Sequence, residues 1–415
     1  MGRGGAIDRT LVSQAGGVTR LWRHETRQLA ETQPLACVLG NLDLVRPLGL
    51  GGIRCAAVVP PGHPVRFSRF VDATLDSSTP ALVDRLLEFA RSQPCRPILF
   101  FEADDEVELI SEERDRLAQG FRFILPPHEL VRDLLDKERF RDLAVRERLP
   151  VPPSKILSPL VESPPTDLGL AYPLVLKPVP YRDKSWYRMI AVSKVLRIEE
   201  PQALSALWDR LAATGLRFLA QEIISGPETR IASYHVYVDS RGKVRGEFTG
   251  RKVRTFPLEF GRSTALETTD DPELVRLGRE IVERLRWQGV AKLDFKRDSQ
   301  GRPWLLEVNP RFSLWMHVGA MAGVNLPALV YADLTGRPRQ PPGQARAGVR
   351  WCWPRPDFAA ARELGIPWPT WLRWALGSEA KTNLSLDDPL PFVLGWGGSK
   401  TAALARSLTQ PRRRG

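Results

Sequence analysis

Residues 290–309 constrain the fold more than any other part of this chain. Apolar and polar side chains alternate over residues 290–295 and again over residues 304–309, as they do in half-buried β-strands. The residues between them, 297–301, are of types that favour turns. The segment is therefore predicted to form a β-hairpin.

The expected turn, centred between positions 300 and 301, fixes how the two strands pair. Asp294 then lies opposite Glu307. Lys292 lies opposite Asn309, and the two-residue period of a strand puts both pairs on one face. The other face is expected to be apolar and to carry Leu293, Phe295, Leu306 and Val308.

The facing carboxylates indicate a metal site. Two carboxylates directly opposite on a sheet lie roughly 5 Å apart and repel each other. A fold keeps them there when a positive charge lies between them or when they share a proton. Asp294, Glu307 and Asn309 are hard oxygen ligands, which favours Mg²⁺ or Mn²⁺ completed by water and substrate phosphates. A solvent-facing pair in a salt bridge with Lys292 is the alternative, but it leaves Asn309-Pro310-Arg311 unexplained.

The N-terminal part shows the alternation of a parallel α/β sheet. Apolar runs at 35–39, 55–59 and 98–101 predict strands, and residues 81–92 have the apolar spacing of a helix. The third run ends in the acidic group Glu102, Asp104 and Asp105. Since ligands of such sheets bind beyond the carboxyl ends of the strands, the loops after Leu39 and Phe101 are candidate substrate contacts.

The remaining elements predict two further α+β regions. Helices are expected at 129–149, 201–214, 271–287 and 314–334, and strands at 173–178, 189–195, 218–224, 231–238, 243–248, 251–256 and in the hairpin. No GxxxxGK[ST] motif is present, so a Walker-type phosphate site is excluded. Lys177, Lys252 and Lys137 are candidate phosphate contacts, although each alone also fits an ordinary surface lysine.

A series of motifs resembles the ATP-grasp superfamily over roughly residues 34–340. In chain order, the motifs are Asp136-Lys137, then residues 172–178 (YPLVLKP), 221–228 (QEIISGPE), 292–294 (KLD) and 306–311 (LEVNPR). The last motif is similar to that of carbamoyl-phosphate synthetase and biotin carboxylase. The Ser-Gly-Pro-Glu segment is similar to that of D-alanine ligase. As a whole, the chain most resembles carboxylate–amine ligases related to D-aspartate ligase.

The resemblance implies a role for each matching residue. Lys137 and Lys177 would contact nucleotide phosphates, Gln221, Glu222, Ile223 and Ile224 would form the hinge beside the adenine, and Glu228 would bind the ribose. Lys252 would lie near the γ-phosphate, and Asp294, Glu307 and Asn309 would hold Mg²⁺. Lys292 and Arg311 would neutralise the substrate carboxylate and the acyl phosphate formed from it.

The fold that the resemblance implies is α/β, with a Rossmann-like domain followed by two ATP-grasp lobes that clamp the nucleotide. The expected divisions are an N-terminal arm (1–33), the Rossmann-like domain (34–130), the central lobe (131–225), the C-terminal lobe with the metal site (226–340) and a Trp-rich extension (341–415). The implied activity is ATP-dependent joining of a small-molecule carboxylate to an amine through an acyl phosphate. A bicarbonate-using carboxylase or carbamoyl-phosphate-type enzyme is the alternative within this fold.

One segment departs from the family pattern. Where the family usually has a glycine- and serine-rich loop over the phosphates, residues 179–189 contain no glycine. Arg182, Lys184 and Arg188 stand in this segment, and arginine side chains can replace backbone N–H donors.

Composition bounds the other hypotheses. The net charge is +12, from 60 Lys+Arg against 48 Asp+Glu, and the positive residues are spread along the chain. This balance fits anionic substrates. It also fits a basic nucleic-acid or membrane-surface protein with a vestigial ATP site, although no aromatic RNA-binding motif is present and nucleic acid is disfavoured. The five histidines and four cysteines show no zinc-ligand spacing and no disulfide framework. With no recognisable signal peptide, a cytoplasmic location is expected.

The Trp-rich extension leaves one question open. Trp368, Trp371 and Trp374 recur at helical spacing, which predicts a helix with an apolar face. Packing of this helix against the body is favoured, and peripheral membrane contact through residues 366–376 is the alternative. A homodimer is compatible with the sequence.

Overall fold

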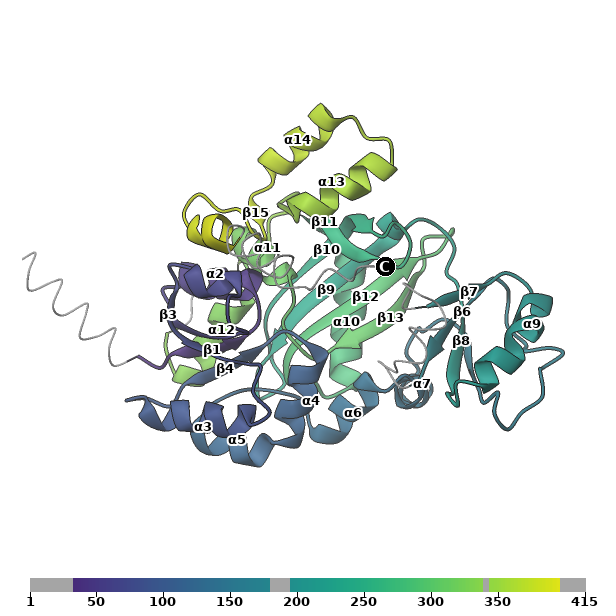
Figure 1. The fold of residues 1–415 in the computed structure, drawn as a ribbon, viewed down its shortest axis with the longest axis horizontal. Helices are drawn as coiled ribbons and strands as arrows, with labels where there is room; N and C mark the ends of the chain where they lie inside the picture. The colour runs from purple at the N-terminus through teal and green to yellow at the C-terminus, as the bar shows by residue number, and fades with distance from the viewer. Residues whose placement is uncertain (1–32, 180–194, 339–342, 396–415) are drawn as a thin grey trace, which may run out of the picture.

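The structure, a computed structural model, describes residues 33–179, 195–338 and 343–395. Three β-sheets carry the fold, and helices cover them (Figure 1). The predicted arm (1–33), the glycine-free loop (179–189) and the predicted strand at 189–195 lie almost wholly outside the described residues. The predicted domain boundaries also stay predictions.

The N-terminal sheet is parallel, with the strand order β3-β2-β1-β4. Its strands are β1 (Ala36–Leu39), β2 (Cys55–Val58), β3 (Val71–Leu75) and β4 (Ile98–Phe101). Around it lie η1 (Pro64–Phe67), α2 (Leu42–Leu50), α3 (Leu82–Ser92), α4 (Asp104–Glu112) and α5 (Arg114–Gly120). The three buried strands match the predicted apolar runs. β3 was not predicted because this edge strand is only partly buried.

The second sheet is antiparallel, with the order β5-β8-β6-β7. Its strands are β5 (Ser154–Leu157), β6 (Leu174–Pro178), β7 (Leu196–Ile198) and β8 (Phe218–Glu222), and α9 (Pro201–Ala212) packs on it. Two helices, α6 (His128–Leu135) and α7 (Lys137–Arg146), precede it. The prediction of one helix over 129–149 was therefore wrong. Asp136 interrupts it and caps α7 by accepting hydrogen bonds from two backbone N–H groups.

The third sheet has seven strands in the order β13-β12-β9-β10-β11-β14-β15. These are β9 (Ile231–Val238), β10 (Val244–Phe256), β11 (Arg262–Thr269), β12 (Gly289–Arg297), β13 (Pro303–Asn309), β14 (Arg350–Cys352) and β15 (Ala380–Lys381). The short η2 (Glu228–Arg230) precedes β9, and α10 (Pro272–Arg284) covers one face. The two strands predicted at 243–248 and 251–256 are one continuous strand, β10.

The predicted hairpin is present and its pairing at the charged end is confirmed. Asp294 faces Glu307, and Lys292 faces Asn309. The turn, however, is centred on residue 300, since Arg297 pairs with Pro303. A bulge between these regions absorbs the one-residue difference.

This bulge corrects the predicted apolar face. Leu293, Phe295 and Val308 are buried as expected, but Leu305 is the buried core residue instead of Leu306. Leu306 is only partly buried and turns into a cavity described below. A strict two-residue alternation does not anticipate this, because a bulge shifts the facing of the residues beyond it by one position.

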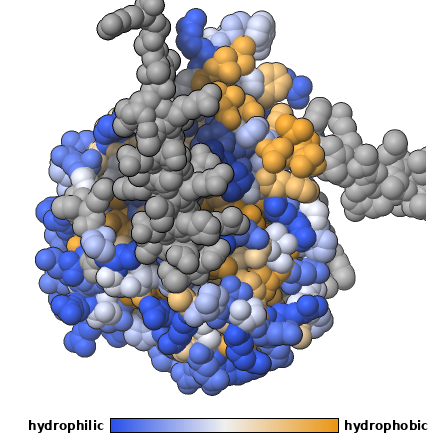
Figure 2. Space-filling view, turned by 90° about the vertical axis from the view of Figure 1, so that its left-hand side faces the viewer, coloured by the Kyte–Doolittle hydropathy of each residue, from blue (hydrophilic) through white to orange (hydrophobic). Residues whose placement is uncertain are grey.

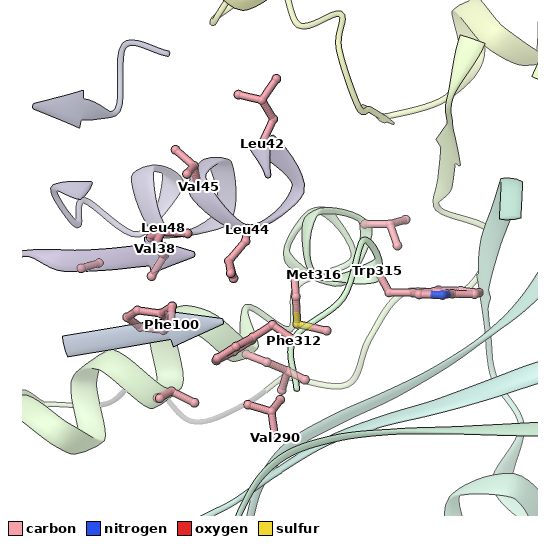
Figure 3. Close-up of a cluster of buried hydrophobic side chains, with 14 of the residues drawn as sticks. Val38, Leu42, Leu44, Val45, Leu48, Phe100, Val290, Phe312, Trp315 and Met316 are labelled. Carbon is pink, nitrogen blue, oxygen red and sulfur yellow. The ribbon is translucent and has the colours of Figure 1, made fainter. Parts of the chain in front are cut away.

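A buried core joins the N-terminal sheet to the large sheet (Figure 3). Phe100 of β4, Phe312 and Met316 belong to it, and the rings of Phe100 and Phe312 are 5.3 Å apart. The predicted helix over 314–334 is two helices, α11 (Trp315–Met321) and α12 (Leu326–Thr335), separated by Gly323 with φ +103°.

In the described part of the chain, no single helix has the length and apolar character of a membrane span. The buried helices α11 and α12 meet these two criteria only when they are counted as one span, and the pair is bent by 88°.

The C-terminal extension adds β14, α13 (Pro354–Glu363), α14 (Trp368–Gly377) and β15. The predicted helix is present, but packing is partial. Trp371 is half-buried against α13 of the extension, and Trp374 is half-buried beside Arg254 of β10, whereas Trp368 is 65% exposed. Figure 2 shows apolar side chains on one face of the molecule as separate groups among hydrophilic ones.

Candidate active site

The facing carboxylates of β12 and β13 form the centre of the candidate site. Asp294 is buried and accepts hydrogen bonds from the Ser233 hydroxyl (2.5 Å) and the Lys292 ammonium (2.5 Å). The Glu307 side chain is 56% exposed, and its Oε1 is 3.9 Å from the Lys292 Nζ. Lys292 therefore lies between the two acids and lowers their repulsion.

Burial and charge act in opposite directions on Asp294. Burial alone raises the pKa of a carboxyl group, but Lys292 and Lys252 outweigh it and hold the pKa of Asp294 below its usual range. Asp294 is therefore an anion at neutral pH. Asp294 therefore does not need to lose a proton before it binds a cation.

The donor set fits a divalent metal of the Mg²⁺ type. Asn309 donates its amide N–H to Glu307 (3.0 Å), and its amide oxygen lies 3.4 Å from an Arg311 nitrogen. Two carboxylates and one amide oxygen are hard ligands, and they leave coordination positions for water or phosphate oxygens. No group of three His, Cys, Asp or Glu residues with metal-site geometry occurs among the described residues.

A cavity of about 840 Å³ brings six of the predicted residues together. They are Lys137, Lys177, Gln221, Glu307, Asn309 and Arg311. Leu306, exposed to the cavity by the bulge, adds an apolar surface beside them. The cavity thus combines cations, an apolar wall and Glu307, one member of the carboxylate pair, which are features that a nucleoside triphosphate with its metal requires.

The two lysines of this cavity come from different elements. The ammonium of Lys137, at the start of α7, donates to the Pro178 carbonyl (2.8 Å). That of Lys177 on β6 donates to the Gln221 side chain (2.8 Å). Burial, together with the charge of Lys177, lowers the pKa of Lys137 to about 8, and burial also lowers that of Lys177. A bound polyanion would offset this loss of solvation.

The predicted hinge, residues 221–224, comprises the last two residues of β8 and the two residues after it. The Glu222 N–H donates to the Pro153 carbonyl (3.0 Å), and the Ile223 N–H donates to the Pro173 carbonyl (3.2 Å). Within the described ranges, the Ile224 N–H donates to no backbone carbonyl. Among these three hinge residues, Ile224 is the one whose backbone N–H has no backbone acceptor, as the predicted role beside an adenine requires.

A second cavity, of about 440 Å³, lies beside the hinge and contains three further predicted residues. Ile223, Glu228 and Lys252 line it. Glu228 pairs with the Lys296 ammonium at 3.3 Å. The predicted residues are thus divided between two cavities. Four of them line neither cavity: Lys292 and Asp294 on β12, and the hinge residues Glu222 and Ile224.

Arg311 links the site to the N-terminal sheet. Its Nε donates to Asp104 (2.5 Å), which follows β4. Although burial lowers the pKa of Arg311, Asp104 outweighs burial and raises it. The next residue, Phe312, anchors the backbone in the core described above. The loop after Phe101 therefore reaches the candidate site, as its position at the carboxyl end of a parallel strand predicted.

Sequence reasoning missed Ser233, Lys296 and Leu306. Lys296 could have been found, because it continues the two-residue period of Lys292 and Asp294 on the same face. Ser233 lies on another strand, and only its pairing with Asp294 brings it into the site. A single sequence carries no signal for that pairing.

Comparisons with known proteins agree with this geometry. Residues 243–354 match the family described as ATP-grasp in the biosynthetic pathway with Ter operon. The chain is 28% identical over 214 residues to a D-alanine–D-alanine ligase of Halorhodospira halophila, covering 47% of this chain and 64% of that ligase. It is 21% identical over 285 residues to a D-aspartate ligase of Enterococcus faecium, covering 65% and 68%.

A solved structure shows the same fold over almost the whole chain. The ADP complex of an N5-carboxyaminoimidazole ribonucleotide synthetase aligns with a TM-score of 0.60 at 11% identity, covering 91% of this chain and 98% of that one. The chain has the ATP-grasp fold, so the predicted fold class is confirmed. Its similarity to a D-alanine–D-alanine ligase and to a D-aspartate ligase agrees with the predicted resemblance to carboxylate–amine ligases.

Proposed function

We propose that the protein is an ATP-dependent carboxylate–amine ligase that uses Mg²⁺. One observation carries the proposal. Glu307, which faces Asp294 across the hairpin, lines one cavity with lysines from two other elements, Lys137 and Lys177. This is the arrangement that a metal-bound triphosphate requires. The ligase names of the curated relatives support the same reaction class.

In the proposed reaction, a substrate carboxylate oxygen attacks the γ-phosphorus of ATP and ADP leaves. The product is an acyl phosphate. An amine nitrogen then attacks the acyl carbon, the C–O bond to phosphate breaks, and an amide, phosphate and a proton result. Removal of water from the site protects the acyl phosphate from hydrolysis.

Each predicted site residue has a role in the proposed reaction. Lys137 and Lys177 bind the phosphates, the Ile224 N–H and Leu306 contact the adenine, and Glu228 binds the ribose. Asp294, Glu307 and Asn309 would hold Mg²⁺, which supplies Lewis-acid stabilisation of phosphoryl charge. Lys252 faces the γ-phosphate. Lys292 and Arg311 neutralise the substrate carboxylate and the acyl phosphate.

The bicarbonate-using alternative is less favoured, because the curated relatives reported above are ligases that act on amino acids by name. The substrates we propose are a small carboxylic acid and a small amine. A cytoplasmic location and a homodimer remain proposals.

The test measures ADP release across a panel of amino acids, offered singly and in pairs with MgATP. A pair that raises ADP release is then tested with its carboxylate labelled with ¹⁸O. Transfer of one labelled oxygen into the released phosphate is expected, because the acyl phosphate keeps it in its bridging position. ADP release without label transfer would identify an ATPase instead of a ligase.

A further inference from the structure

One carboxylate of the C-terminal extension is fully buried and carries an unusual number of donors. Asp357, in the first turn of α13, is 0% exposed. The donors that reach it are Arg254 Nε and Nη2 (2.8 Å each), the Thr264 hydroxyl (2.9 Å), Trp371 Nε1 (2.9 Å) and the Cys352 thiol (3.5 Å). Asp357 is therefore satisfied by this chain alone and is not a ligand site.

The main partner of Asp357 lies on the strand that carries a predicted catalytic lysine. Arg254 is two residues from Lys252 on β10. Along β10 and β11, Lys252 pairs with Leu266 and Arg254 with Ala265, so the register shifts at Val253, and it shifts again between Arg254 and Thr255. A bulge changes the direction of the side chains around it and needs local contacts to fix it. The two parallel hydrogen bonds from Arg254 to Asp357 fix the residue that follows Val253.

The surroundings of Lys252 connect this bulge to the candidate site. Lys252 lines the cavity that also contains Glu228, and it is close enough to Asp294 to act on its charge. Leu364, just after α13, lines the same cavity. The Arg254 guanidinium also lies 5.0 Å from the centre of a Trp374 ring. The extension thus contacts the back of the bulge and one wall of the cavity.

We propose that Asp357 is a positioning residue, which holds the bulge of β10 so that Lys252 points at the γ-phosphate of bound ATP. The inference rests on the proposed function, because it takes Lys252 as a γ-phosphate contact. It makes the C-terminal extension a part of the phosphoryl-transfer machinery.

The test compares the binding of two nucleotides by calorimetry in the full chain with Mg²⁺. ADP lacks the γ-phosphate, and β,γ-methylene-ATP carries it without transferring it. The dissociation constant of ADP divided by that of β,γ-methylene-ATP measures contact with the γ-phosphate alone. This quotient is called the ratio below. This readout needs no knowledge of the acid or the amine, and a general loss of stability does not change it.

Four variants give the answer. Lys252→Met is expected to lower the ratio about tenfold, the effect of one lost charged contact. Asp357→Asn is expected to lower it about threefold or more through misplacement of Lys252. Arg254→Gln, which breaks the pair from the other side, is expected to match it. Asp357→Asn combined with Lys252→Met is expected to equal Lys252→Met alone.

The matched control is Asp388→Asn. Asp388 is the other buried acid of the extension, and it accepts hydrogen bonds from Arg46, the Ser68 hydroxyl and the Arg69 N–H. It also anchors the extension, but to α2 and the segment before β3 instead of β10, so the ratio should stay within about twofold of wild type.

Three outcomes would overturn the inference. If folded Asp357→Asn and Arg254→Gln keep the wild-type ratio while Lys252→Met lowers it, Asp357 does not position Lys252, although Lys252 still contacts the γ-phosphate. If Lys252→Met leaves the ratio unchanged, Lys252 does not contact the γ-phosphate. Absence of nucleotide binding in the wild type would remove the proposed function as well. If the variants give the expected ratios but the amino-acid panel gives no ADP release, the inference about Asp357 is supported and the ligase reaction is not.

Discussion

Two groups of buried charge in this molecule differ in how completely their partners satisfy them. In the extension, Asp357 accepts from four side chains and Asp388 from two side chains and a backbone N–H. In the candidate site, Asp294 accepts from Ser233 and Lys292, while Glu307 is more than half-exposed. The carboxylates of the extension, Asp357 and Asp388, form a closed group, in which donors of this chain occupy the carboxylate oxygens. The carboxylates of the candidate site keep oxygen atoms available for a ligand.

The difference separates structural charge from functional charge. A buried carboxylate that only stabilises a fold needs all its lone pairs occupied, because each unmet one raises the free energy of the native state. A carboxylate that must bind a metal needs some left open. Donor completeness is thus a better guide to function here than burial, since Asp357 and Asp294 are both buried.

The largest expected effect is on catalysis. Glu307→Ala should lower turnover by about 10³-fold or more, because it removes a metal ligand worth several kcal/mol in the transition state. Its melting temperature should stay near that of the wild type, since the side chain is exposed. Turnover and thermal denaturation measure the two effects. Glu273→Ala is the control, because Glu273 is also an exposed acid but lies on α10. Wild-type turnover in Glu307→Ala would show that Glu307 is not a metal ligand.

The next effect is on stability and sharpens the comparison directly. Asp357→Ala should reduce the free energy of unfolding by about 3–5 kcal/mol, because it leaves the nearly buried Arg254 guanidinium unpaired. Asp294→Ala should cost less while it blocks turnover, because the Lys292 ammonium keeps Glu307 as a second partner at 3.9 Å. Chemical denaturation of both variants measures this. Equal losses would show that the two acids do not differ in kind.

A smaller effect concerns pH. The pKa of Lys137 is about 8 in the free protein, and a bound phosphate favours the charged ammonium, so the pKa is higher in the complex. ADP affinity is therefore constant well below pH 8 and falls as the pH rises through 8. From pH 7.5 to 9 the dissociation constant should rise roughly eightfold, which is the loss of protonated lysine over that interval. Calorimetry measures it, and Lys137→Arg should abolish the dependence. An equal rise in that variant would assign the titration to another group.

The smallest effect tests one donor of the closed group. Thr264→Val removes a single hydrogen bond to Asp357 and leaves the others. The free energy of unfolding should fall by about 0.5–1.5 kcal/mol, the typical worth of one hydrogen bond. Denaturant titration measures it. A loss as large as that of Asp357→Ala would mean that the donors act as one unit.

The sequence predicted the parts of the site that depend on local pattern. The facing of Asp294 and Glu307 followed from alternation and one turn, over only 14 positions of chain. The prediction of Leu306 in the core failed, because the bulge that reverses it leaves no mark in the residue types. The turn was placed half a residue off, and the bulge compensated this error at the charged end.

The parts that could not be predicted depend on contacts between distant segments. Arg254 and Asp357 are 103 positions apart, and Arg311 and Asp104 are 207 apart. Nothing in either residue type says which partner it finds. Lys252, Lys177 and Lys137 came from resemblance to a family, since alone each also fits an exposed lysine.

The seven-stranded sheet has a practical consequence. Its strand order runs without interruption from the acid-bearing hairpin to β14 and β15, which belong to the extension. A shortened protein that ends near residue 340 would leave the outer edge of β11 without its neighbour. Such a bare edge is a template on which strands of other molecules can add. Expression of the ATP-grasp lobes alone would then favour aggregates, and a soluble fragment would need β14 retained or a charged residue placed on that edge.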